Sequence, residues 1–260
     1  MESPLYNGDF SIFGMIMKIL NLICAHKDFE WSDLSEKELD TYFVLTHNEI
    51  KTNLPHVLKY EELPDYKNEF WSEMSALMFV YEKMDFDWIT INHYRRRLLV
   101  PNYNEVYVSY PREFTITMKE SYEINHGYGD MELLTDIILK SNLSTDFKTE
   151  WVKFLTSKYM ICYNMASCPK EVFMDWMSVV RFIINEYKSR LNLNTFEDVK
   201  KMVDGRFKNN HLQYRLGGFI AERITNVYFN MYAKQHNNLP IIKNPLHCCD
   251  VKLLEDGMTI

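Results

Sequence analysis

Glycine and proline are scarce in this chain of 260 residues, which contains eight of each. Disordered segments are rich in such residues and poor in apolar ones, so a chain that is 47% hydrophobic is expected to fold. The chain also lacks an excess of positive charge, because 36 acidic residues outnumber 29 lysines and arginines and give a net charge of −7. That balance argues against general nucleic-acid binding, although it is compatible with a local basic groove.

Long apolar runs and regular cysteine spacing are missing as well. No segment has the roughly 20 continuous apolar residues that a transmembrane helix needs. Residues 10–24 are apolar, but Gly14 interrupts them, and they lack the basic start and cleavage site of a signal peptide. The five cysteines have no framework spacing, which indicates reduced thiols and a cytoplasmic protein. His247, Cys248 and Cys249 are adjacent, but a zinc site needs further well-spaced ligands, so no metal site is predicted there.

Apolar periodicity predicts strands that alternate with helices. We expect strands near residues 17–25, 41–46, 87–94, 105–110, 159–166 and 239–242, and helices over residues 66–84, most of 115–157, 169–191 and 219–234. This alternation favours a largely parallel sheet that is covered on both faces. We interpret residues 1–16 as an N-terminal extension, residues 17–245 as a single domain and residues 246–260 as a C-terminal tail.

The most informative stretch is a hydrophobic run that ends in His93, Tyr94, Arg95, Arg96 and Arg97. In open α/β sheets, ligands bind just past the carboxyl ends of the strands. Arginine forks donate paired hydrogen bonds to phosphate oxygens, so this cluster predicts a phosphorylated ligand. A solvated turn is the alternative interpretation, because runs of charged residues are usually exposed.

Two further clusters lie in the N-terminal half. His26 and Lys27 end the first predicted strand, where many α/β folds receive a nucleotide; a surface turn is the alternative. Glu69 and Glu73 share one face of the predicted helix at 66–84, and the apolar neighbours of Glu73 draw it toward the core. A partly buried carboxylate needs a cationic partner, which the arginines of the next strand can supply. Two solvated glutamates are the alternative.

The C-terminal half contains two more clusters. Asn164 follows an apolar segment and offers both a donor and an acceptor, either to a sugar hydroxyl or to the turn before the next helix. Glu222 and Arg223 follow two glycines that open a helix, Gly217 and Gly218. Free backbone amides at a helix start attract anions, and a glutamate beside a sugar site can act as a general base. Alternatively, Glu222 only favours the positive end of its helix.

In this order and spacing, the clusters resemble a known family. The chain is similar to the bacterial capsular-polysaccharide-type glycosyltransferases with an HYRR motif, formerly a domain of unknown function. The resemblance covers roughly residues 17–235, and the matching stretches are residues 26–27, 68–75, 91–96, 126–131, 163–165 and 218–224. The chain departs from the family pattern where Ala221 replaces a common serine and Ala166 a phenylalanine. The loop that recognises the nucleotide and the choice of sugar are the features that can least be inferred for this chain from the family.

The resemblance implies a GT-A-like (Rossmann-like) α/β fold, with a mostly parallel sheet flanked by helices and a helical C-terminal portion. It implies a hexosyl- or pentosyltransferase that moves a sugar from a nucleotide-sugar donor, most simply a UDP-sugar, to a hydroxyl acceptor. The acceptor would be a polysaccharide or a lipid-linked glycan in the bacterial cytosol. One alternative is a phage-type DNA glycosyltransferase that acts on a hydroxymethylated base in the cytosol of an infected host. Another is a non-catalytic module that binds nucleotide-sugar or glycan.

The resemblance also implies roles for particular residues. The catalytic candidates are Glu222 and Asp130. The candidates for donor binding are His26, Lys27, His93, Arg95, Arg96, Arg97 and Arg223, and those for sugar or acceptor binding are Asn68, Glu73, Tyr94 and Asn164. No metal or other cofactor is expected to be required, because fixed cations can stabilise the departing diphosphate and Asp85-Phe86-Asp87 precedes the strand. The sequence predicts no oligomeric state.

Overall fold

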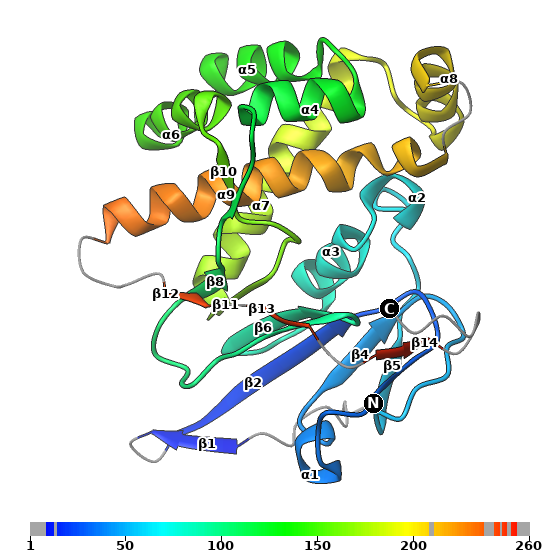
Figure 1. The fold of residues 1–260 in the computed structure, drawn as a ribbon, viewed down its shortest axis with the longest axis vertical. Coiled ribbons are helices and arrows are strands. Elements are labelled where there is room, and N and C mark those ends of the chain that lie inside the picture. The colour runs from blue at the N-terminus through cyan, green and yellow to red at the C-terminus, as the bar shows by residue number, and fades with distance from the viewer. Residues whose placement is uncertain are drawn as a thin grey trace.

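The computed structural model describes residues 9–12, 15–207, 211–236, 242–244, 246–248 and 251–253, which form a sheet covered by helices (Figure 1). The main sheet follows the order β12 (Ile242–Asn244), β8 (Tyr107–Ser109), β11 (Ala166–Pro169), β6 (Trp88–His93), β2 (Met15–Cys24), β4 (Phe43–Thr46) and β5 (His56–Lys59). Strands β6, β2, β4 and β5 are mutually parallel, whereas β11 is antiparallel to both β6 and β8. The predicted fold class, a mostly parallel sheet flanked by helices, is confirmed.

Short strands extend this sheet and flank it. They form the pairs β1 (Asp9–Ile12) with β2, β7 (Arg96–Leu98) with β6 and β13 (Leu246–Cys248), β3 (Phe29–Trp31) with β14 (Val251–Leu253), and β9 (Arg112–Glu113) with β10 (Tyr159–Met160). Parts of the predicted extension and of the predicted tail are therefore strands. Residues 1–8, 13–14, 249–250 and 254–260 of those two segments lie outside the described residues, and Cys249 is among them.

The helices lie mainly in the C-terminal part, as expected. They are α1 (Glu36–Leu39), α2 (Asn68–Trp71), α3 (Met74–Lys83), α4 (Met118–His126), α5 (Asp130–Lys140), α6 (Thr145–Thr156), α7 (Lys170–Arg190), α8 (Phe196–Phe207), the 3₁₀ helix η1 (His211–Arg215) and α9 (Leu216–Gln235). Thr117 caps α4 by accepting from the amide of Glu120, and Ser144 caps α6 in the same way through Phe147. The region from 115 to 157, which was expected to be mostly helical, is thus divided into α4, α5 and α6.

Four predicted elements differ from the observed ones. The helix expected over residues 66–84 is divided at Ser72, whose φ of 56° no α-helix accommodates. The strand expected over residues 159–166 is a loop in its centre, because Tyr163 and Asn164 also have positive φ angles, of 77° and 49°. Gly217 and Gly218 do not precede α9 but form part of its first turn. The strand expected at 239–242 begins at Ile242, and residues 239–241 are outside the described chain.

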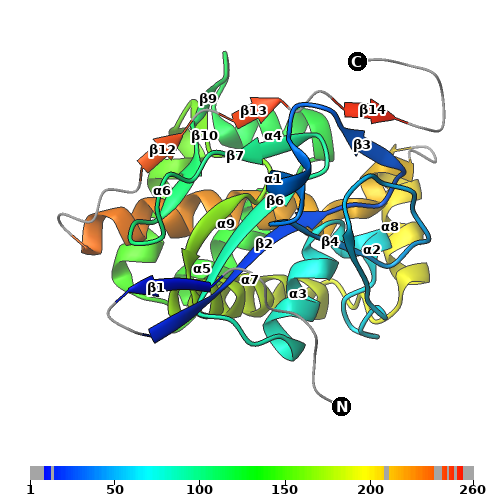
Figure 2. The same ribbon diagram turned by 90° about the horizontal axis from the view of Figure 1, so that it is seen from below.

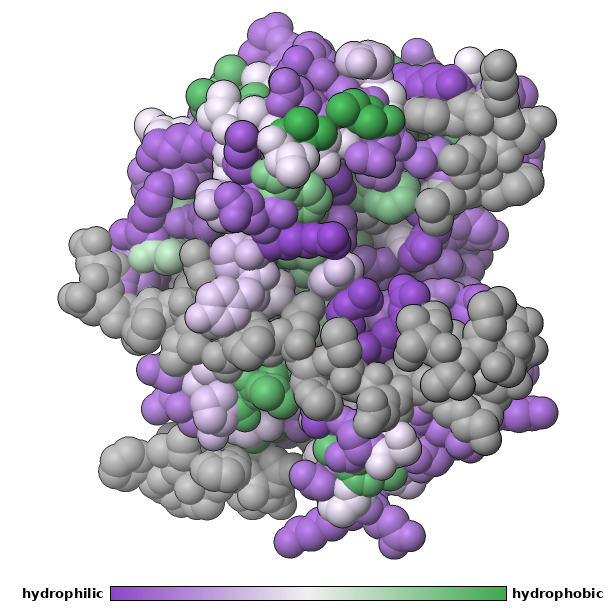
Figure 3. All heavy atoms as spheres, viewed as in Figure 1, coloured by the Kyte–Doolittle hydropathy of each residue, from purple (hydrophilic) through white to green (hydrophobic). Residues whose placement is uncertain are grey.

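The core lies between the sheet and the helices α3, α7 and α9. In the view of Figure 2, β2 and β6 run in front of these helices. Strand β6 is buried from Trp88 to Asn92, as expected for an inner strand with layers on both sides. A second cluster, with Phe29, Trp31 and Tyr94, covers the opposite face. No helix among the described residues is long and apolar enough to cross a membrane. On the face in Figure 3, the coloured apolar side chains form small separate patches.

Candidate functional site

The parallel strands β2 and β6 end side by side, and their ends place two histidines at one pocket. Cys24 of β2 is in register with His93 of β6, and His26 follows two residues later. The pocket has a volume of about 20 Å³, and its polar lining includes His26, Asn68, Glu73, His93 and Arg215. The first four of these were predicted as site residues from separate segments of the sequence. The structure brings them together.

Both histidines are neutral at physiological pH. Burial, followed by the charges of Arg95 and Arg96, lowers the pKa of His93 to about 3. Burial, followed by the charge of Arg215, lowers the pKa of His26 to about 4. The backbone amide of Arg95 donates to Nδ1 of His93 over 3.2 Å, which places the ring proton on Nε2. His93 can therefore donate one hydrogen bond to a ligand without carrying charge.

The three consecutive arginines have different environments. Arg95 is exposed, and Arg96 is partly exposed with its guanidinium 4.1 Å from the centre of the Tyr163 ring. Arg97 is buried and pairs with Asp33 at 3.2 Å on the opposite face of the sheet. Arg95 and Arg96 are thus available to a ligand, whereas the contacts of Arg97 are those of a structural ion pair.

The side chains of Tyr94 and Lys27 lie beside the histidines. Tyr94 is 3% exposed, and its ring centre lies 4.3 Å from that of His93 and 5.2 Å from that of His26. Tyr94 therefore packs against both imidazole rings, and it is too buried to offer a surface to an acceptor. Lys27 is exposed next to His26.

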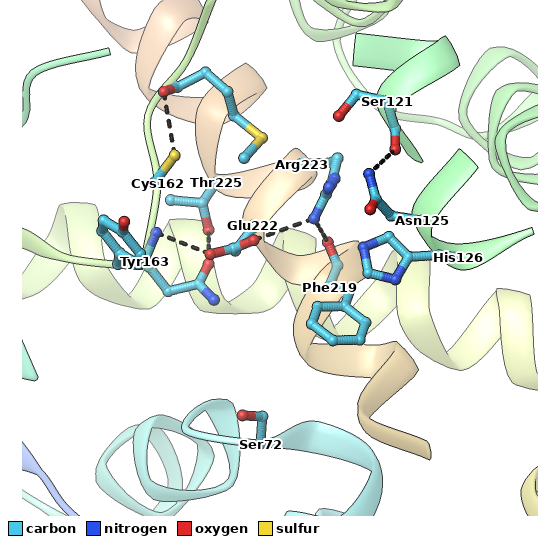
Figure 4. A network of polar contacts seen from close by, with 12 residues as sticks. Ser72, Ser121, Asn125, His126, Cys162, Tyr163, Phe219, Glu222, Arg223 and Thr225 are labelled. Atoms are coloured by element: carbon cyan, nitrogen blue, oxygen red, sulfur yellow. Dashed lines mark hydrogen bonds and ion pairs between the residues drawn. The ribbon is translucent and has the colours of Figure 1, made fainter. Parts of the chain in front are cut away.

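A loop from the C-terminal half closes the site. Its two residues with left-handed backbone, Tyr163 and Asn164, are held by side chains of other elements. The amide of Tyr163 donates to Oε1 of Glu222 over 2.9 Å (Figure 4). Nδ2 of Asn164 donates to Oε1 of Glu73 over 3.1 Å, and its Oδ1 accepts from Oγ1 of Thr225 over 2.8 Å. Non-glycine residues with such backbone angles concentrate at functional sites, where surrounding contacts maintain them.

Glu222 is the carboxylate that α9 contributes beside this loop. Burial raises its pKa, and the charge of Glu73 adds to that effect, while Arg223 opposes it. Nη1 of Arg223 lies 3.1 Å from Oε2 of Glu222 and also donates to the carbonyl of Phe219 over 3.0 Å (Figure 4). The side chain of Glu222 remains 18% exposed, so an acceptor can reach it. Arg223 is only 7% exposed, and its contacts orient Glu222.

Asp130 does not line this pocket. It is 1% exposed at the start of α5, and it accepts from Oη of Tyr187 over 2.6 Å and from Oη of Tyr122 over 3.3 Å. Nη1 of Arg206 pairs with it at 2.8 Å. These partners belong to α4, α7 and α8, so Asp130 joins four helices, and we assign it a structural position instead of the catalytic one expected from the resemblance.

Arg215 is the site residue that the sequence did not reveal. Its Nη2 donates to Oγ of Ser72 and lies 3.5 Å from Oε2 of Glu73. A Cβ atom at Gly217 would lie 2.6 Å from a ring carbon of Phe70, and one at Gly218 would lie 2.7 Å from Cβ of Ser72. The two glycines therefore permit α9 to approach α2 closely. In the sequence, these two glycines indicate the start of a helix that binds an anion, and nothing there points to Arg215 itself.

No group of three or more potential metal ligands occurs in the part of the chain that is described. Asp85 and Asp87, the pair that resembles a metal motif, lie at the amino end of β6, opposite the pocket. Asp85 pairs with Lys18 at 3.1 Å and with Lys170 at 2.6 Å, and Asp87 accepts from the amide of Lys18 over 2.8 Å.

Comparison with known proteins gives a family and a fold. A family model described as a domain of unknown function, DUF4422, matches residues 99–235. That segment contains Asn164, Arg215 and Glu222 but neither of the two histidines. The fold is similar to that of the WbbM bifunctional glycosyltransferase in its apo structure, with a TM-score of 0.62 and 14% sequence identity over 92% of this chain. This chain spans 46% of that protein. No curated protein matches the sequence.

Proposed function

Since this chain belongs to the DUF4422 family, we propose that it is a glycosyltransferase that uses a nucleotide-sugar donor. The observation that carries the proposal is the pocket at the ends of β2 and β6, where His26 and His93 meet Glu73. Glu222 of α9 is linked to this pocket through the loop of Tyr163 and Asn164, which bonds to Glu222 on one side and to Glu73 on the other. Ligands of open α/β sheets bind at this edge. The similarity of the fold to that of a glycosyltransferase supports the proposal.

The donor half of the site is cationic. Arg95 and Arg96 would bind the diphosphate, the neutral rings of His26 and His93 would donate single hydrogen bonds, and Lys27 would lie near the nucleoside, for which we favour uridine. When the nucleoside diphosphate leaves, negative charge develops on a phosphate oxygen, and positioned donors stabilise it. Removal of one such donor typically costs about 3–4 kcal/mol in the transition state. In this proposal the fixed charges take the place of a metal ion.

The acceptor half lies on α9 and the loop at Tyr163. Glu222 would accept the proton of the attacking hydroxyl as the new C–O bond forms at the anomeric carbon. The bond from that carbon to the phosphate oxygen breaks, and the nucleoside diphosphate leaves with its electron pair. A raised pKa improves a carboxylate as a base near neutral pH. Glu73 and Asn68 would position the sugar or the acceptor. The predicted role of Asn164 in sugar binding would be indirect, because its amide holds Glu73, and Arg223 would orient Glu222.

We further propose a single transferase domain over residues 17–245, a polysaccharide or lipid-linked glycan as the acceptor, and action in the cytoplasm. The strand β1 before residue 17 would belong to the same domain, because it pairs with β2. Cys24, Cys162 and Cys168, the cysteines whose side chains are described, are free and buried, which supports a reducing compartment.

The direct test is incubation with a panel of nucleotide-sugars while the release of nucleoside diphosphate is measured, with and without a chelator. We expect release with one donor, its persistence in chelator, and its loss in Glu222→Gln. Binding of a donor without release would indicate a binding module, and the absence of both would contradict the proposal. A steep decrease of acceptor binding with salt would identify DNA instead of a neutral glycan.

A further inference from the structure

Arg215 and Glu73 form an ion pair inside the pocket that the donor phosphates would have to enter. The side chain of Arg215 is 37% exposed and that of Glu73 is 24% exposed, so solvent reaches both. Ion pairs with this degree of exposure are weak. A ligand with more negative charge than one carboxylate can therefore compete for the guanidinium.

Arg215 lines the same pocket as both histidines, at the ends of β2 and β6. Its charge is also among the causes that lower the pKa of His26 and of His93. Arg215 thus adds a cation to the pocket beside the residues to which the diphosphate has been assigned.

The pocket is small while the ion pair is in place. Its volume is roughly 20 Å³, which admits one water-sized group, and Glu73 and Arg215 are both among its lining residues. Separation of these two side chains would enlarge the space beside the guanidinium and give a phosphate group access to it.

We propose that Arg215 binds the donor phosphate, and that in the empty site Glu73 occupies the guanidinium until the donor displaces it. This inference rests on the proposed function. The exchange leaves neither group without a partner. Glu73 keeps the hydrogen bonds from Asn164, at 3.1 Å, and from Ser72. Arg215 exchanges one carboxylate oxygen for phosphate oxygens, to which arginine donates strong paired hydrogen bonds.

The position of Arg215 depends on the glycines that follow it. Gly218 lies against Ser72, and this contact brings the start of α9 within reach of Glu73. Arg215 stands at the N-terminal end of α9, immediately before its first turn. Small movements of that end relative to α2 would open or close the ion pair.

The test is calorimetric titration of uridine diphosphate, and of inorganic pyrophosphate as a probe independent of the nucleoside, into the wild type and three variants. Arg215→Gln is expected to weaken binding at least about tenfold, the size of one lost charge-assisted hydrogen bond. Glu73→Gln is expected to tighten it several-fold, because the competing charge is gone. The control is Arg190→Gln, which removes an arginine of similar exposure that pairs with Asp136 at 3.6 Å away from the pocket and is expected to change nothing.

The double variant Arg215→Gln/Glu73→Gln tests whether the donor phosphate and Glu73 compete for Arg215. If Glu73 acts by competing for Arg215, its substitution has no tightening effect once Arg215 is absent. Equal affinity in the wild type and in Arg215→Gln, or weaker binding in Glu73→Gln, would overturn the inference. If Arg215→Gln does not fold, Arg215→Lys retains the charge but not the fork and is expected to bind at least several-fold more weakly than the wild type. A wild type that binds neither probe and releases no diphosphate from any donor would instead refute the proposed function.

Discussion

Asn164 donates a hydrogen bond of 3.1 Å to Glu73, which lies 91 positions earlier in the chain. The bond joins the loop before β11 to the start of α3. On its other side Asn164 accepts from Thr225 of α9 over 2.8 Å, so one buried amide fixes three elements around the pocket. Asn164 therefore positions the carboxylate of Glu73 and is too enclosed, at 1% exposed, to present its own amide to a sugar.

Replacement of this amide should lower activity and stability together. In Asn164→Ala, Thr225 and Glu73 each lose a buried partner, which we expect to cost about 2–3 kcal/mol of unfolding free energy. Donor turnover should fall at least tenfold, because Glu73 is no longer held. Denaturant titration and the release of nucleoside diphosphate measure the two effects. Full turnover in a folded Asn164→Ala protein would show that Glu73 needs no such support.

The adjacent arginines Arg96 and Arg97 should give opposite phenotypes. Arg96→Ala should lower turnover about 100-fold or more with little change in stability, because it removes a donor at the leaving group. Arg97→Ala should lower the unfolding free energy by about 3–5 kcal/mol, since it removes the guanidinium that pairs with the mostly enclosed Asp33, whose side chain is 12% exposed. Thermal melts and turnover per folded molecule separate the two. The assignment fails if Arg97→Ala is stable and inactive.

Acid should destabilise the protein through the two pocket histidines. In the folded state their pKa values are lowered, to about 4 for His26 and about 3 for His93, from the model-peptide value of 6.5. The unfolded chain then binds more protons between these values, so the stabilisation is complete above pH 6.5 and is lost as the pH falls toward 3. Melting temperatures measured from pH 7 to pH 4 should fall less steeply in His93→Gln than in the wild type. Parallel curves would contradict the neutral state of His93.

The close contact of α9 with α2 gives a matched pair of glycine substitutions. In Gly218→Ala the new Cβ would lie 2.7 Å from Cβ of Ser72, so the helices must separate at a cost of about 1–3 kcal/mol. Turnover should decrease as well, because Arg215 at the start of α9 is displaced from the pocket. Gly205→Ala in α8 is the control, since no atom lies within 4 Å of its new Cβ. There alanine should stabilise the helix by about 0.5–1 kcal/mol. Equal stabilities would argue against the steric explanation.

The sequence was informative where local pattern determines structure. The strand expected near residues 87–94 is β6, and the helix expected over residues 169–191 is α7, because apolar periodicity marks both segments. Two site residues predicted from the sequence, His26 and His93, meet because parallel neighbours end at the same edge, a rule that needs no long-range information.

What the sequence did not reveal depends on contacts between distant segments. Ser72 adopts a positive φ that its residue type does not favour, and this angle divides the expected helix. Arg215 reaches Glu73 across 142 positions, and Asp130 is enclosed by partners from three other helices. Residue type alone does not distinguish a buried structural carboxylate from a catalytic one. Three-dimensional packing makes that distinction.

The order in which the site's parts occur along the chain affects its synthesis. Both histidines are translated before Arg215 and Glu222, which belong to η1 and α9. A nascent polypeptide that has left the ribosome only as far as α8 therefore has the imidazoles but lacks Arg215, which completes the lining of the pocket. Such an intermediate has no complete site, so the site becomes competent only after η1 and α9 have been synthesised.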